Sequence, residues 1–232
     1  MRALLFAAGR GERMRPLTDA LPKPLLEVRG RPLIAWHLEK LAATGVREVV
    51  INTSWLHRCF EAVLGDGERF GLRIHYLHEG DVPLETGGGM LNALPLLGDD
   101  PFLVVNGDVW SDFDFRRLPR RPEGLAHLVM VDNPPQHPHG DFVLDPEGLL
   151  HAGAGRRLTY AGIGLYHPRL LDGWREALGG TPADPGPPPR FKLAPLLAAA
   201  MARGDVTGQH HPGAWTDVGT PERLQALREA LA

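Results

Sequence analysis

A glycine loop rich in cations carries the first candidate chemistry. Residues 7–18 read Ala-Ala-Gly-Arg-Gly-Glu-Arg-Met-Arg-Pro-Leu-Thr, and Pro22-Lys-Pro24 follows a few residues later. Backbone N–H groups in such a loop suit phosphate oxygens, and Gly9 and Gly11 would let the main chain approach a ligand closely. Arg13 and Lys23 would supply the positive charge that a triphosphate requires. The string therefore predicts a phosphate site.

The same residues exclude two better-known phosphate loops. The dinucleotide pattern needs a third glycine where this chain has Met14, and the Walker pattern needs Gly-Lys-Ser/Thr, which is absent. A bare Gly-x-Gly is more often a solvated turn. Here one of only three lysines in the chain, Lys23, stands between two prolines beside that loop, and the full string favours a ligand site.

Two aspartates form the second pattern. Asp108 ends the apolar run Val104-Val-Asn-Gly-Asp108, and Asp217 lies in Trp215-Thr-Asp-Val-Gly219. At the carboxyl ends of parallel strands, carboxylates face the ligand crevice and can hold Mg²⁺ together with phosphate oxygens. Asn-Gly-Asp is also good turn chemistry, so a single aspartate would be a weak signal. Asp217 supplies the second carboxylate that strengthens it.

Strands and helices that must position these residues alternate through the first half of the chain. Apolar runs and helical spacing predict strands over 3–6, 49–51, 72–77, 102–105 and 125–131, and helices over 33–43, 55–64 and 90–97. This order predicts an α/β fold with a Rossmann-like, mainly parallel mixed sheet and helices on both faces. The second half is less regular, with the following elements expected: a hairpin around 145–148, a core strand over 160–166, helices over 168–177, 193–203 and 221–231, and a short strand within 214–220.

Composition places the chain among ordinary globular proteins. It has 232 residues, a net charge of −3, 43% hydrophobic and 23% charged residues, which excludes fibrous, disordered and membrane classes. The lone Cys59 cannot form an internal disulfide, and no signal peptide is recognisable, so a cytoplasmic location is predicted. No repeat or linker is found, which predicts one domain over 1–232. The Gly- and Pro-rich segment 179–189 is predicted to be a mobile loop.

Nucleic-acid and membrane partners are not expected. Arginines cluster at 116–117 and 120–121, but the net charge is negative and no aromatic residues interleave, so a solvated face is predicted. No apolar stretch approaches the roughly 20 residues that a membrane helix needs. The leucines of the helix over 221–231 suit core packing or a dimer contact, so a monomer or a homodimer is expected.

The N-terminal string resembles the signature of the sugar-1-phosphate nucleotidyltransferases, in which an Ala-Gly-x-Gly-x-Arg loop precedes Pro-Leu-Thr and then Pro-Lys-Pro. The resemblance implies an enzyme that transfers a nucleotidyl group from a triphosphate to a sugar 1-phosphate and releases pyrophosphate. It implies that Asp108 and Asp217 hold the catalytic Mg²⁺ and that Arg13 and Lys23 are catalytic. The nucleotide-binding residues that it implies are Ala8, Gly9, Gly11, Glu12, Arg13, Lys23, Glu85, Thr86 and Gly87.

The same resemblance implies where the acceptor sugar binds. The implied sugar-binding residues are Asn106, Gly140, Asp141 and Gly162. Nucleotide binding would fall mainly on residues 1–120, and sugar binding mainly on 121–232. Many members carry a Glu-Lys-Pro lysine that grips the sugar phosphate, whereas this chain has Ala152-Gly-Ala-Gly-Arg156 there, so that contact must come from elsewhere.

Further motifs resemble those members of the family that transfer uridylyl groups to N-acetylmuramate 1-phosphate in peptidoglycan recycling. They lie at 84–89, 105–110, 131–133, 140–142, 191–197 and 217–220. UTP and that acceptor are therefore favoured, with Arg156, Arg157 or Lys192 as partners for the lactyl carboxylate. Two alternatives stay open: a mannose- or glucose-1-phosphate nucleotidyltransferase using GTP or UTP, and a catalytically silent regulatory protein that binds nucleotide sugars. Retention of both metal carboxylates argues against the silent protein.

Overall fold

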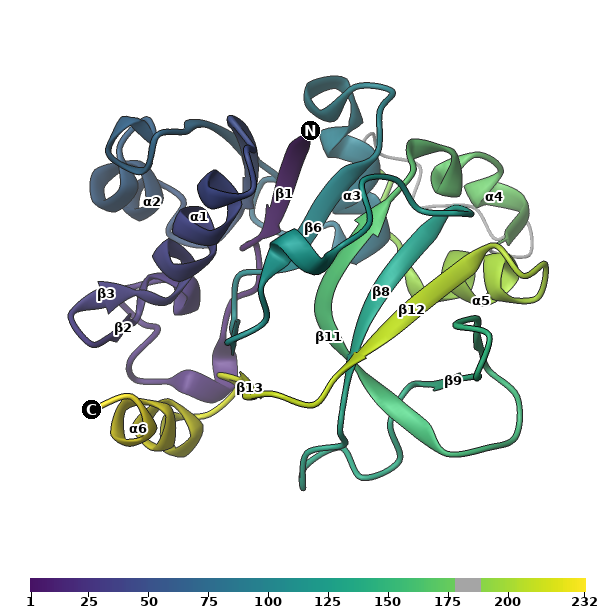
Figure 1. Cartoon of the computed structure of the whole chain (residues 1–232). Helices are drawn as coiled ribbons and strands as arrows, with labels where there is room; N and C mark the ends of the chain where they lie inside the picture. The colour runs from purple at the N-terminus through teal and green to yellow at the C-terminus, as the bar shows by residue number, and fades with distance from the viewer. Residues whose placement is uncertain (178–188) are drawn as a thin grey trace. The chain divides into compact units, whose positions relative to one another are not determined.

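The structure is a computed structural model that describes residues 1–177 and 189–232 (Figure 1). Most of the segment predicted to be a mobile loop lies outside the described residues. The chain divides into two compact units: unit 1 contains Met1–Pro83, Val105–Phe115 and Ala214–Ala232, and unit 2 contains Leu84–Val104 and Arg116–Gly213. Unit 1 therefore combines the N-terminal strands with the C-terminal segment, and the division into a nucleotide-binding half 1–120 and a sugar-binding half 121–232 stays a prediction.

Unit 1 is built on three parallel strands, β1 (Arg2–Phe6), β4 (Glu48–Thr53) and β5 (Arg73–His78). Most of their central residues are buried, which explains why β1 and β4 read as continuous apolar runs. The crossover from β1 to β4 contains α1 (Leu33–Ala43), and the crossover from β4 to β5 contains α2 (Arg58–Leu64) (Figure 1). Parallel strands require crossovers of this kind.

Shorter elements complete unit 1. They are η1 (Glu12–Met14), η2 (Lys23–Leu25), the hairpin β2 (Glu27–Val28) and β3 (Arg31–Pro32), η3 (Glu68–Phe70), the antiparallel pair β7 (Val109–Ser111) and β13 (Trp215–Asp217), and α6 (Pro221–Ala230). Strand β6 (Phe102–Asn106) contributes residues to both units, and η4 (Phe115–Arg117) begins at their boundary.

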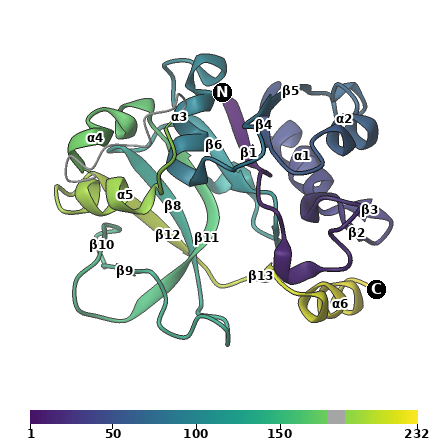
Figure 2. The same cartoon turned by 180° about the vertical axis from the view of Figure 1, so that it is seen from behind.

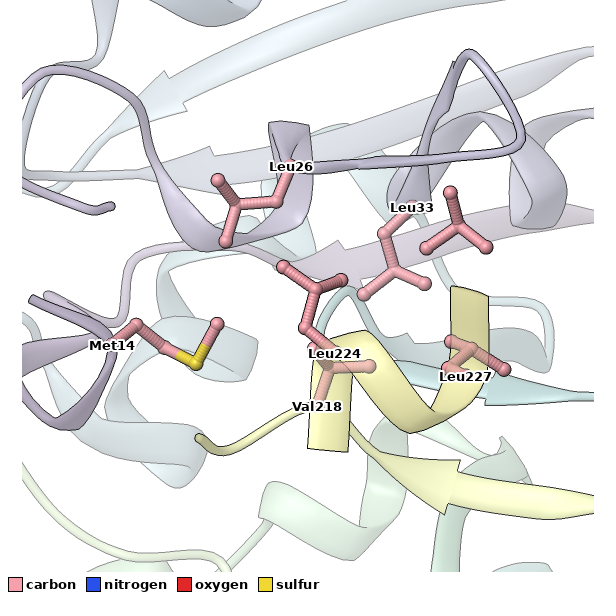
Figure 3. Close-up of a cluster of buried hydrophobic side chains, with 7 residues drawn as sticks. Met14, Leu26, Leu33, Val218, Leu224 and Leu227 are labelled. Atoms are coloured by element: carbon pink, nitrogen blue, oxygen red, sulfur yellow. The ribbon is translucent and has the colours of Figure 1, made fainter. Parts of the chain in front are cut away.

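One hydrophobic cluster joins the segments of unit 1 that carry the sequence motifs. Its members come from the glycine loop, the segment after Pro22-Lys-Pro24, and the C-terminal segment: Met14, Leu26, Val28, Leu33, Val218, Leu224 and Leu227 (Figure 3). Each of these side chains is at most 6% exposed. Burial of such side chains contributes about 2 kcal/mol each, so the cluster holds three distant parts of the sequence together.

Unit 2 contains a mixed sheet. Strand β8 (Ala126–Val131) pairs antiparallel with β11 (Arg157–Tyr166) and parallel with β12 (Val206–His211), and these three strands are seen from behind in Figure 2. Strands β9 (Phe142–Leu144) and β10 (Leu150–His151) form the expected hairpin. The helical elements are α3 (Glu85–Leu97), η5 (Pro168–Leu171), α4 (Trp174–Ala177) and α5 (Ala194–Met201).

The predicted α/β class with a mixed, mainly parallel sheet is confirmed: β1, β4 and β5 pair parallel, whereas β8 and β11 pair antiparallel. Two local predictions are wrong. The helix expected over 168–177 is broken, because Gly173 adopts a φ of +69° between η5 and α4. The glycines expected before the helix over 90–97 instead lie inside α3. None of the described helices is long and apolar enough to cross a membrane.

Candidate functional site

The glycine loop leaves β1 at a point held by a buried polar network. Ala7 N–H donates to Asn52 Oδ1 (2.7 Å), and Asn52 Nδ2 donates to Glu79 Oε1 (2.7 Å). Asn52 is 2% and Glu79 9% exposed. Buried polar groups that are hydrogen-bonded in this way orient the chain around them. Sequence reasoning missed both residues, although a polar residue within the apolar run of β4 was the available signal.

Gly11 shapes the loop for two reasons. Its φ of +65° favours glycine, and a Cβ there would lie 3.0 Å from Thr18 Cγ2. Its carbonyl oxygen accepts hydrogen bonds from Met14 N–H (2.8 Å) and Thr18 Oγ1 (2.9 Å). At Gly9, by contrast, a Cβ would meet no protein atom within 4 Å. The chain therefore requires glycine at Gly11, whereas the space at Gly9 is open to a ligand.

A pocket of about 460 Å³ lies against this loop. It is lined by Arg10, Gly11, Glu12, Arg13, Lys23 and Gly219. Three cations and one carboxylate give the lining a positive balance, which suits an anionic ligand. Four of these residues were predicted as nucleotide-binding, and Arg10 and Gly219 were not. Ala8 and Gly9 are not part of the lining, and Ala8 is 6% exposed.

Arg13 and Arg10 are held differently in this pocket. Arg13 is exposed and makes no salt bridge with any residue that the structure describes. Arg10 Nη2 donates to the carbonyl oxygen of Asp81 (2.7 Å). The guanidinium of Arg13 is therefore available to an anion without breaking an ion pair.

The structure brings Asp108 and Asp217 onto neighbouring segments. Gly107 N–H donates to Phe6 O (2.8 Å), which ties the end of β6 to the end of β1. Asp108 follows directly, and Val218 N–H donates to Asp108 O (2.8 Å) beside the β7–β13 pair. Two aspartates far apart in the sequence therefore lie at the carboxyl end of β6 and of β13, in one compact unit.

Each of these carboxylates already has a cation of the chain as its partner. Lys23 Nζ lies 2.5 Å from Asp108 Oδ2, and Arg223 Nη1 lies 2.7 Å from Asp217 Oδ1. The side chain of Lys23 is 12% exposed and that of Arg223 is 19% exposed. Such half-buried pairs are screened less by solvent than surface pairs. Arg223 was not among the predicted residues.

The chemistry of the donors fits a hard divalent cation. Carboxylate oxygens are the ligands that Mg²⁺ prefers, and it usually takes one or two of them while keeping water and phosphate oxygens. Among the described residues, no group of three or more His, Cys, Asp or Glu side chains could hold a metal ion. That Asp108 and Asp217 hold this cation stays a prediction.

Helix α1 holds β7, the strand that follows Asp108. His37 Nε2 lies 2.7 Å from Val109 O, and burial lowers the pKa of His37 to about 4, so the ring is neutral at pH 7. Lys40 Nζ donates to the carbonyl oxygens of Ser111 and Phe113. Burial also lowers the pKa of Lys40. The scarcity of lysine in the sequence was the one signal that Lys40 has a specific role.

The residues expected around the base occupy the first turn of α3, in unit 2. Gly87 N–H donates to Phe191 O (2.9 Å), and Thr86 Oγ1 accepts from Leu193 N–H (3.0 Å). A Cβ on Gly87 would lie 2.4 Å from the Phe191 ring. Glu85 has a φ of +64° and pairs with Arg190 Nη2 at 3.2 Å. In this arrangement the polar groups bind segment 189–193, and their contact with a base stays a prediction.

The residues expected around the sugar are also engaged by the chain. Asp141 Oδ2 accepts from Tyr160 N–H (2.8 Å), and Asp141 Oδ1 lies 3.1 Å from His137 Nε2. A Cβ on Gly140, whose φ is +59°, would lie 2.6 Å from Asn133 Oδ1. Within unit 2 these contacts fix the turn before β9 against β11.

The remaining expected sugar residues lie on strands or exposed turns. Gly162 has a φ of +71° where the register between β11 and β8 shifts, and Asn106 is half-buried at the end of β6. Arg156 pairs with Asp132 (3.2 Å), Arg157 Nη2 donates to Ala152 O (2.9 Å), and Lys192 is exposed. A role of any of them toward a sugar stays a prediction.

Two known proteins are similar to this chain over nearly its full length. The chain is 49% identical to the N-acetylmuramate alpha-1-phosphate uridylyltransferase of Neisseria meningitidis serogroup B, over 100% of this chain and 98% of the relative. It is 35% identical to the protein of the same name from Caulobacter vibrioides, over 99% and 96% of the two chains.

A solved structure shares the fold. The structure described as a glucose-1-phosphate thymidylyltransferase of Bacillus anthracis aligns over 99% of this chain and 94% of its own, with a TM-score of 0.82 and 20% identity. The family model for nucleotidyl transferases matches residues 2–143, a range that contains the glycine loop, Lys23 and Asp108. The chain therefore belongs to the nucleotidyl transferase family.

Proposed function

We propose that this protein transfers a uridylyl group from UTP to N-acetylmuramate 1-phosphate, giving the UDP-sugar and pyrophosphate, in the cytoplasmic recycling of peptidoglycan. One observation carries nucleotidyl transfer: Asp108 and Asp217 lie on neighbouring segments, in the unit that holds a cationic pocket of about 460 Å³. The choice of substrates rests on the names of the two relatives that are similar over the full length of the chain.

The acceptor brings its own nucleophile. An oxygen of the sugar phosphate is anionic at neutral pH, so it needs no strong general base from the protein. This oxygen attacks the α-phosphorus of UTP in line, the bond from the α-phosphorus to the bridging oxygen breaks, and that oxygen leaves with pyrophosphate. The protein's main tasks are therefore to position two phosphates and to offset their repulsion.

The charged residues of unit 1 would perform those tasks. Arg13, which has no salt bridge among the described residues, would neutralise the leaving pyrophosphate. Lys23 would exchange its bond with Asp108 for the reacting phosphates, which releases the carboxylate. Asp108 and Asp217 would hold Mg²⁺, which when bound supplies positive charge to the reacting phosphate oxygens.

Substrate selection falls to residues of unit 2 and the end of β6. Glu85, Thr86 and Gly87 would lie against the base, which requires segment 189–193 to give up or share its hydrogen bonds with Thr86 and Gly87. The sugar would bind near Asn106, Gly140, Asp141 and Gly162. Arg156, Arg157 and Lys192 are the candidates for the lactyl carboxylate, and their exposure or weak pairing leaves them able to turn toward it.

A grid of substrates tests this proposal. UTP, GTP, dTTP and ATP are each combined with the 1-phosphates of N-acetylmuramate, N-acetylglucosamine, glucose and mannose, and pyrophosphate release is measured with and without Mg²⁺. We expect the highest kcat/KM with UTP and N-acetylmuramate 1-phosphate. Without Mg²⁺, we expect no release of pyrophosphate from any pair. A clear preference for mannose or glucose 1-phosphate would reject the acceptor. Absence of release from every pair, with nucleotide sugars still binding, would indicate a silent regulatory protein.

A further inference from the structure

The ion pair between Arg223 and Asp217 is built into the first turn of α6. Thr220 caps this helix by accepting the N–H of Arg223 (3.4 Å), and Leu224, 1% exposed, belongs to the hydrophobic cluster of unit 1 (Figure 3). Arg223 lies between these two anchors, so its backbone is fixed. From there its side chain reaches back to Asp217 Oδ1 at 2.7 Å.

The chain makes room for this guanidinium at Gly219. A Cβ on that residue would lie 2.1 Å from Arg223 Nη2 and 3.0 Å from Asp217 Oδ2. Gly219 does not have a positive φ, so an added Cβ would be opposed by two side chains: the guanidinium of Arg223, which would have to shift, and the carboxylate of Asp217. Glycine in Asp217-Val-Gly219 is therefore explained by the approach of Arg223, in addition to its place in the lining of the pocket.

We infer that Arg223 is a positioning residue: it fixes the orientation of the Asp217 carboxylate so that this carboxylate is ready to bind the divalent cation, and Gly219 is required because the guanidinium crosses it. The inference rests on the proposed function, since it takes Asp217 to be a ligand of that cation. Groups that orient a ligating carboxylate commonly change metal affinity by about 10- to 100-fold when they are removed.

The sign of the effect separates positioning from simple charge. Arg223 is a cation beside a cation site, so its field alone opposes the binding of Mg²⁺. If only charge mattered, Arg223→Gln would strengthen cation binding. If Arg223 orients Asp217, the same substitution weakens binding although it removes a positive charge.

Manganese provides a readout that does not depend on turnover. Binding of Mn²⁺ is measured by electron paramagnetic resonance, on the protein alone and with α,β-methylene-UTP, for wild type, Arg223→Gln, Arg223→Lys, Gly219→Ala and the double variant Gly219→Ala/Arg223→Gln. We expect the dissociation constant of Mn²⁺ to rise about tenfold in Arg223→Gln and in Gly219→Ala. The double variant should bind about as well as Arg223→Gln, because the shorter glutamine removes the closest contact of the added methyl group, the one at 2.1 Å to Arg223 Nη2.

The matched control lies on the same helix. Arg228 donates from Nε to Glu27 O (2.9 Å), so Arg228→Gln removes one positive charge from α6 without touching Asp217. This variant should bind Mn²⁺ as wild type does. Melting temperatures of all variants are recorded, and a change in Mn²⁺ affinity without a matching loss of stability separates positioning from damage to the fold.

Two results would overturn the inference. One is an unchanged or stronger Mn²⁺ affinity in Arg223→Gln, and the other is additive losses from Gly219→Ala and Arg223→Gln. Both are distinct from failure of the proposed function. If the substrate grid showed a different preferred base or sugar, the expected Mn²⁺ affinities of the protein without nucleotide would not change. If Arg223→Gln left the Mn²⁺ affinity unchanged, the substrate preference expected in the grid would not change.

Discussion

In unit 1, the charged side chains of the expected site residues line a pocket. In unit 2, the polar groups of several expected site residues are instead hydrogen-bonded to other segments of the same unit. Arg13 and Lys23 line the cavity of unit 1, and Lys23 is paired with a carboxylate that a metal could share. In unit 2, Thr86, Gly87 and Asp141 hydrogen-bond to other segments of the same unit. One family signature therefore contains residues that line a cationic pocket and residues that shape the backbone.

This comparison predicts two classes of variant. Substitutions at the pocket of unit 1 should remove activity and leave stability nearly unchanged. Substitutions at the tied residues of unit 2 should lower stability, in addition to weakening any contact that these residues make with a substrate.

The largest effect is expected for Asp108→Asn and Lys23→Ala. Each removes a charge that the proposed mechanism uses, so kcat should fall by about a hundredfold or more at saturating Mg²⁺. The free energy of unfolding should change by only about 1 kcal/mol, because the pair is partly solvated. Pyrophosphate release and urea unfolding measure the two quantities. Asp19→Asn, on the exposed pair with Arg15, is the control and should behave as wild type. Near-normal rates would remove both residues from the reaction.

The buried His37 of unit 1 is expected to affect stability and not ligand binding. Its folded-state pKa is about 4 instead of 6.5, so between these values the unfolded chain binds a proton that the native protein does not. The free energy of unfolding should therefore fall as the pH drops from about 6.5 to about 4, by up to about 3 kcal/mol. Urea titrations between pH 4 and 7 measure this slope. In His37→Gln, which can still donate to Val109 O, the slope should be smaller, and identical slopes would contradict the assignment.

A smaller and sharper test compares two glycines. On Gly87 a methyl group would meet the Phe191 ring at 2.4 Å, so Gly87→Ala should lower the free energy of unfolding by about 2 kcal/mol. On Gly9 a methyl group meets no protein atom within 4 Å, so Gly9→Ala should keep its stability but raise the KM for UTP. Thermal unfolding and initial rates distinguish them. If Gly9→Ala also lost stability, the space beside it would not be reserved for a ligand.

The outlines of the fold were accessible from the sequence because the strongest signals are local. The apolar runs of β1 and β4 and the helical spacing of α1 depend on which residues must be buried, and α1 was predicted with its observed bounds, Leu33–Ala43. Prediction was wrong where a backbone conformation decided the outcome. Gly173 breaks the helix expected over 168–177, and the glycines of 84–89 lie inside α3 because segment 189–193 packs against them.

Four of the six residues that line the pocket were also accessible from the sequence, since the string 7–13 carries both charge and backbone freedom and 22–24 places a lysine between two prolines. Their supports were not accessible. Asn52, His37 and Arg223 act on residues distant in the chain. The polar Asn52 stands out within the apolar run of β4, but the local sequence does not name the partner of any of the three. Each forms its hydrogen bond because the fold brings it close to a partner.

The class of fold, the family signature and the charges available for nucleotide transfer could all be predicted from the residues alone, because they follow from local composition and spacing. Which of those charges meet depends on how distant segments pack. Burial of Met14, Leu26, Val218 and Leu224 in one cluster gathers three remote segments. The pairing of β7 with β13 and the hydrogen bond from Val218 N–H to Asp108 O place Asp108 and Asp217 on neighbouring segments, in the unit that holds the cationic pocket.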